Sequence, residues 1–264
     1  MLATLLAAEL IGGAVLLAVT PVSPVVAASI VGDGRTLVTE NLGAGPGQEL
    51  LSRVATAMGP ATAAVEAFWG TDWPRRIQVT ATGSDRQFAE LAGGDADVSQ
   101  WADVAAVAIA DRVDPDRRVA QGQRIVFAPG AVFMSPSALQ IVVTHELFHY
   151  AARIDTVPDA PRWLTEGVAD FVARPAGNKA PMSAGPVSLP TDAELDAPGP
   201  GRVQAYDRAW EFARFVADHF GTSKLRELYL SACGPGHVEP AMAIALVLGV
   251  EVPDLLVMWQ RWRV

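Results

Sequence analysis

The feature that most constrains this chain is the sequence HELFH at residues 145–149, which lies in a stretch without a helix breaker from 136 to about 153. Ser135 and Pro136 are typical of an N-cap and a first helical turn. Apolar residues on nearly every face predict that this helix is buried. Residues four apart lie on one face of a helix, about one turn apart, so the two imidazoles suit two corners of a zinc tetrahedron.

Glu146 lies about 100° round this predicted helix from His145, beside the coordination position that remains open. There it is expected to accept a proton from water that the metal activates. Glu166, in the sequence WLTEGVADF at residues 163–171, offers a third ligand from a second helix beyond a proline-containing turn. Two histidines, one glutamate and one water form the open arrangement of a catalytic zinc site, whereas a structural site closes all four positions with protein ligands.

Two further residues of the second helix support this interpretation. Asp170 lies one turn after Glu166, on the same face, where it is expected to accept the outer N–H of a ligating histidine and fix its tautomer. Gly167 would let the second helix lie close to the first. The sequence therefore predicts one Zn²⁺ per chain, held by His145, His149 and Glu166.

HELFH followed by WLTEGVADF resembles the gluzincin metallopeptidases, the thermolysin-like and aminopeptidase-like enzymes, and in particular the bacterial peptidase-MA-like group. The resemblance covers about residues 120–264. It implies that His145, His149 and Glu166 are zinc ligands, that Glu146 is the general base and that Asp170 orients a ligand. It also implies a hydrolase that cleaves peptides or proteins.

The same resemblance implies that a strand at residues 124–128 is the sheet edge along which an extended peptide binds. It implies an oxyanion stabiliser on a later helix, for which Tyr206 is the candidate and His219 the second choice. Packing with Trp210 and Ala213 is the alternative role for Tyr206, and a cap at the helix C-terminus is the alternative for His219.

The expected fold is α+β and zincin-like: a small, mostly antiparallel sheet packed on the HELFH helix, followed by a helical subdomain. Residues 32–155 are expected to form the α/β part and 156–264 the mainly helical part. Alternating or apolar runs predict strands at 76–82, 104–110 and 124–128. Residues 32 to about 120 carry no motif that assigns a role.

The N-terminus predicts an extracytoplasmic protein. Glu9 is the only charged side chain in residues 1–31, which read as a signal peptide or an N-terminal membrane anchor. Small residues at 26–28 suit cleavage near Ala28. No lysine or arginine precedes the apolar run, and a buried helix of a cytosolic protein is the alternative.

The formal net charge of −9, without a basic run, argues against nucleic acid as a partner. A single cysteine, Cys233, excludes an intramolecular disulfide and a cysteine-rich zinc finger.

Three rival interpretations compete with this one. A metzincin-like site would use Asp155 as third ligand, but Ala152 stands where that motif requires a glycine. An intramembrane protease is excluded by the polar residues that flank the motif and by the absence of a later run of about 20 apolar residues. An exported zinc-binding module without turnover would act by binding a partner, although such a module has no need of a base at Glu146.

Overall fold

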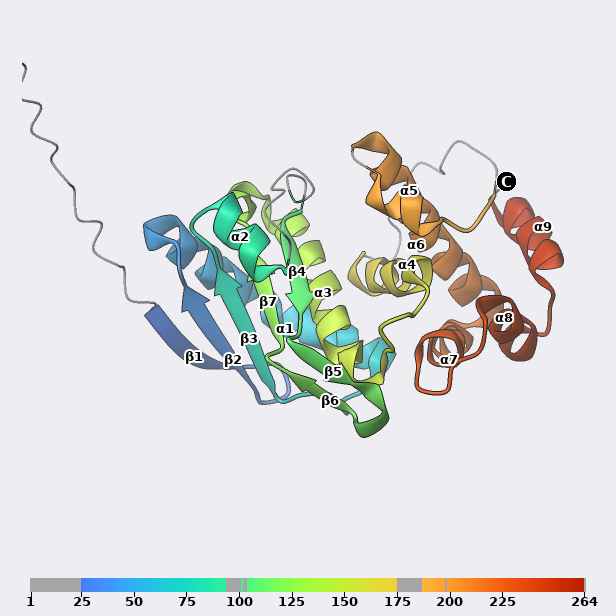
Figure 1. Ribbon diagram of the computed structural model, residues 1–264, viewed down its shortest axis with the longest axis horizontal. Coiled ribbons are helices and arrows are strands. Elements are labelled where there is room, and N and C mark those ends of the chain that lie inside the picture. Colours follow the sequence, from blue (N-terminus) through green and yellow to red (C-terminus); the bar gives the residue numbers. More distant parts are fainter. Residues whose placement is uncertain (1–24, 94–100, 102–103, 175–186, 198, 264) are drawn as a thin grey trace, which may run out of the picture.

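The computed structural model describes residues 25–93, 101, 104–174, 187–197 and 199–263 (Figure 1). Within these residues every strand precedes residue 128, and the regular structure that follows is helical. A sheet with its covering helices therefore forms the first half, and a helical assembly forms the second. This arrangement agrees with the α+β class expected from the sequence.

The five-stranded sheet has, in spatial order, β1 (Val25–Val31), β2 (Arg35–Asn41), β3 (Arg76–Ala81), β7 (Arg124–Phe127) and β4 (Ala106–Ile109). The outer pairs, β1 with β2 and β7 with β4, are antiparallel, whereas β2 with β3 and β3 with β7 are parallel. The expectation of a mostly antiparallel sheet is therefore wrong, and the sheet is mixed. Helix α1 (Ala44–Trp69) provides the long connection that parallel β2 and β3 require.

The strand expected at the edge lies inside the sheet. Strand β7 pairs with β3 on one side and with β4 on the other, so the prediction that residues 124–128 form an open edge is wrong. Strand β4 covers that edge because Ala106–Ile109 fold back antiparallel on β7. Strands β5 (Arg112–Asp114) and β6 (Val119–Gln121) form a separate hairpin between them in the chain.

The N-terminal boundary also differs from the expectation. Residues 25–31 pair with β2 over their whole length as strand β1, so the sheet begins before the boundary expected after residue 31. The cleavage position expected near Ala28 lies inside β1. The remainder of the expected leader, residues 1–24, lies outside the described residues.

Helices of the second half follow one another closely. They are α3 (Pro136–Ala152), α4 (Arg162–Ala173), α5 (Asp192–Asp196), α6 (Pro200–Phe220), α7 (Thr222–Cys233), α8 (Pro240–Leu248) and α9 (Val252–Trp262). In the described residues, no single helix has the length and apolar character to cross a membrane, and α8 with α9, bent by 70°, meets those criteria only as a pair.

Helix α3 lies at the centre of the molecule, between the sheet and the C-terminal helices (Figure 1). The hydroxyl of Ser135 accepts a hydrogen bond from the Ala138 amide and caps its N-terminus, with Pro136 in the first turn. Its Phe148 is fully buried and packs edge-on against Trp69 of α1 and Tyr229 of α7. These contacts fix the axis of α3, and with it the direction of its polar side chains.

Gly167 sets the distance between α4 and α6. A Cβ atom at this position would lie 2.4 Å from the carbonyl oxygen of Ala209 on α6. Cβ atoms in proteins essentially never come within 3.0 Å of a non-bonded atom. A glycine therefore lets the two helix backbones meet. The sequence predicted a close approach at Gly167, but towards α3; the nearest backbone belongs to α6.

We expect Gly167→Ala to lower the free energy of unfolding by about 1–3 kcal/mol, because the added methyl group forces the packed helices apart. Gly201→Ala is the matched control: it lies in α6, where the nearest atom to an added Cβ is 3.5 Å away, and it should be neutral or stabilising by up to about 1 kcal/mol. Urea denaturation measures both. Equal stability of the two variants would contradict the close packing of α4 on α6.

Candidate metal centre

His145 and His149 project from the same face of α3, one turn apart, as the spacing predicted. Their Nε2 atoms are 3.1 Å apart. Each neutral imidazole carries one N–H and one lone pair, so two Nε2 atoms at this distance are stable only with a proton or another cation between them.

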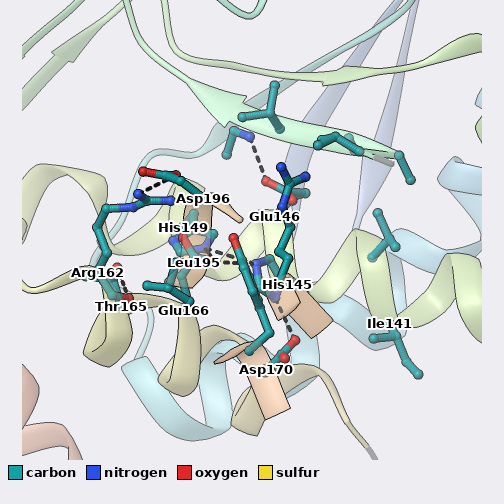
Figure 2. A pocket seen from close by; sticks show the side chains of 18 of the residues that line it. Ile141, His145, Glu146, His149, Arg162, Thr165, Glu166, Asp170, Leu195 and Asp196 are labelled. Carbon is teal, nitrogen blue, oxygen red and sulfur yellow. Dashed lines mark hydrogen bonds and ion pairs between the residues drawn. The ribbon is translucent and has the colours of Figure 1, made fainter. Parts of the chain in front are cut away.

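Glu166 reaches the same point from α4. Its Oε2 atom lies 3.2 Å from Nε2 of His145 and 3.4 Å from Nε2 of His149. Figure 2 shows the three side chains pointing towards one another. The structure thus brings together the three residues that the sequence analysis selected as metal ligands.

The dimensions of this triangle suit a small divalent cation. Ligands at about 2.0–2.1 Å in a tetrahedral zinc site lie roughly 3.3–3.4 Å from one another. The observed separations of 3.1, 3.2 and 3.4 Å are close to that value. Three protein donors leave a fourth position open, and the side chains are only 14–17 % exposed.

The electrostatics of the triangle favour positive charge. Burial alone lowers the pKa of His145, but hydrogen bonds to Asp170 and Glu166 outweigh it and raise the pKa well above its usual value. Burial raises the pKa of Glu166, but the two histidines outweigh it and hold that pKa well below its usual range. A carboxylate that stays ionised in a buried place is what a cation requires of its ligand.

Asp170 binds the ring nitrogen of His145 that points away from the candidate centre. Its Oδ1 atom accepts a hydrogen bond of 2.9 Å from Nδ1 of His145, which leaves the Nε2 lone pair facing the centre. Asp170 is itself buried, and its Oδ2 atom accepts a bond of 2.6 Å from Arg174. The role predicted for Asp170 as a tautomer-fixing partner agrees with this geometry.

Arg174 extends the network by one more step. It also donates to Asp207 at 3.0 Å, and its guanidinium lies 4.5 Å from the centre of the Trp210 ring. No motif in the sequence pointed to Arg174. Its position one turn after Asp170 is a signal that would have suggested an ion pair within the helix.

Glu146 points from α3 towards strand β4 (Figure 2). Its Oε2 atom accepts a hydrogen bond of 2.6 Å from the backbone N–H of Ala108 in that strand. Its side chain is buried, and burial raises the pKa of this carboxyl group above its usual value. The contact with Ala108 could not be predicted from the sequence, because every residue carries a backbone amide and the residue type does not show which amide is used.

An open cavity of about 1390 Å³ surrounds these groups. His145, Glu146, His149, Glu166 and Asp170 all line it. Strand β4 forms one wall of the cavity, and the first turns of α6 form another. The candidate centre is therefore accessible to a molecule larger than water.

Tyr206 lines the same cavity from α6, and its pKa is raised by burial and by the nearby charge of Glu166. His219 does not line it. That histidine is exposed in the last turn of α6 and contacts Phe215 and Phe220, so it is not available as an oxyanion stabiliser.

Asp155, the third ligand of the metzincin-like alternative, is bonded elsewhere. Its carboxylate accepts a hydrogen bond of 2.8 Å from Arg118, and it is absent from the group of converging ligand atoms found in the described residues. The structure thus disfavours that alternative.

Comparison with known proteins provides no independent assignment: no family model matches the chain, and no curated protein matches it.

We expect Asp170→Asn to weaken zinc binding by about 10–100-fold, because an amide in place of the carboxylate holds the His145 N–H less strongly. Competition with a chromogenic chelator measures the affinity. Asp196→Asn is the matched control, since Asp196 lines the same cavity but pairs with Arg162 rather than with a histidine. Equal zinc affinity in both variants would show that Asp170 does not orient His145.

Proposed function

We propose that the protein is a zinc-dependent metallopeptidase of the gluzincin type with a zincin-like fold. The convergence of His145, His149 and Glu166, with Glu146 beside them in an open cavity, is the observation that carries the proposal. The apolar N-terminal residues support a place of action outside the cytoplasmic membrane.

The chemistry would be hydrolysis of a peptide bond. A zinc ion in this position supplies Lewis acidity, which lowers the pKa of water and polarises the scissile carbonyl group. Glu146 accepts the proton of the attacking water and delivers it to the leaving amine. The Ala108 amide holds one carboxylate oxygen, which leaves the other free to accept that proton.

Strand β4 would bind the substrate backbone. The carbonyl oxygen of Ala105 accepts a hydrogen bond from the N–H of Ala128, the residue after β7. Residues of an antiparallel pair alternate in direction, so the backbone N–H and C=O groups of Ala106 and Ala108 point away from β7. Ala108 uses its outward N–H for Glu146. Ala106 therefore offers its N–H and C=O on the cavity side to an extended peptide, by β-strand addition.

Tyr206 would stabilise the oxyanion. Its pKa lies above its usual value of 10, so the hydroxyl keeps its proton at neutral pH and remains a donor. Tyr206 and β4 line the same cavity, which suits a donor to the carbonyl oxygen of a peptide bound along β4.

We expect Glu146→Gln to retain zinc and the fold but to lower kcat by about 10²–10⁴-fold, because the amide cannot accept the proton of water. Zinc content and cleavage of a broad peptide library on the same sample measure both. Zinc binding in the wild-type protein without any chelator-sensitive cleavage would support the binding-module alternative instead. Cleavage that is indifferent to this substitution would refute the proposed mechanism.

We expect Tyr206→Phe to lower kcat by about 10²–10³-fold with little change in KM, because the lost hydroxyl acts on charge that develops only in the transition state. His219→Phe is the matched control and should keep wild-type kcat. If Tyr206→Phe left kcat intact and changed only the stability, packing would be the role of this tyrosine.

A further inference from the structure

Arg153 forms a hydrogen bond with the backbone of strand β4 on the side that faces the cavity. It is the first residue of the 3₁₀ helix Arg153–Asp155, directly after α3, and its Nη2 atom donates to the carbonyl oxygen of Ala108 at 2.5 Å. The N–H of the same alanine donates to Glu146. Both outward groups of Ala108 are therefore occupied by side chains, and backbone pairing with a bound peptide ends before this residue.

Among the described residues, no carboxylate forms an ion pair with Arg153. Two other arginines of the cavity have such partners, since Arg162 pairs with Asp196 and Arg174 pairs with Asp170. In the part of the chain that the structure describes, Arg153 forms no ion pair, and its buried Nε–H has no hydrogen-bond acceptor. A buried donor without an acceptor is costly and therefore rare in folded proteins.

The position of Arg153 would let its positive charge contact a bound substrate. Its side chain lines the same cavity as the candidate metal centre, and it shares Ala108 with the proposed general base. A guanidinium matches a carboxylate with two parallel hydrogen bonds, and such charge-assisted bonds are strong where water is partly excluded.

We propose that Arg153 is a subsite for a substrate carboxylate, either an acidic side chain or the C-terminal carboxylate of a peptide. This proposal rests on the proposed peptidase function. A peptide that pairs with β4 at Ala106 would reach the end of the ladder at Ala108, where its carboxylate meets Arg153. The enzyme would thus select substrates by negative charge at one fixed position relative to the scissile bond.

Arg202 is the rival cation. It lines the cavity from the first turn of α6 and makes no ion pair among the described residues, but its Nε atom donates to the carbonyl oxygen of Ala197, which follows α5. It belongs to the helical wall rather than to the strand that would bind the peptide. Its variant therefore tests whether charge in general, or Arg153 in particular, selects the substrate.

The test uses the full-length zinc-loaded protein and matched quenched-fluorescence peptides, with Glu, Gln or Lys placed in turn at each position around the cleaved bond. A second pair of peptides ends in a free carboxylate or an amide, which distinguishes a side chain from a chain terminus. We expect kcat/KM to favour the carboxylate by about 10–100-fold at one position, with Lys worst. Arg153→Gln should reduce the ratio between Glu and Gln to near one, and Arg153→Lys should retain part of it.

Arg117→Gln, an exposed arginine outside the cavity, and Arg202→Gln are controls that should keep the wild-type ratio. Fluorescence anisotropy with the Glu146→Gln protein gives the same ratio from Kd without turnover. A folded Arg153→Gln protein with an unchanged ratio would overturn the proposal, as would loss of the ratio in Arg202→Gln or a wild-type protein indifferent to Glu, Gln and Lys. Absence of cleavage and binding for every peptide would instead refute the peptidase function itself.

Discussion

The rest of the site depends on the contact between α3 and α4, where the Glu166 carboxylate meets two imidazoles within 3.4 Å. Three polar groups in a mostly buried place are stable only when their charges compensate. That contact requires α4 to lie in one position, which the missing side chain of Gly167 allows and the bond between Asp170 and His145 fixes. The packing of α4 and the placement of the candidate ligand atoms therefore depend on the same contacts.

The sequence predicted what depends on helical periodicity. The face of α3 that carries His145 and His149, and the face of α4 that carries Glu166 and Asp170, follow from residue spacing along each helix. The order of strands could not be predicted in this way, because pairing joins residues far apart in the chain and leaves only a weak local pattern. Strands β4 and β7 were both expected, yet only the fold shows which of them is the edge.

The site residues that the sequence analysis missed act through tertiary contacts. Ala108 contributes through its backbone, and Arg153 acts on the carbonyl of that alanine from the far end of α3. The choice between Tyr206 and His219 needed the structure as well, since both lie on α6 and only the position of that helix shows which end faces the cavity. A motif thus identifies the ligands of a centre but not the walls around it.

The strand order also determines where the described chain begins relative to the candidate centre. The described chain begins at β1, and β1 and β4 are the opposite edges of the sheet. Four strand spacings separate these edges, roughly 19 Å at about 4.8 Å each. The described chain therefore begins at the sheet edge farthest from β4, the strand that forms one wall of the cavity.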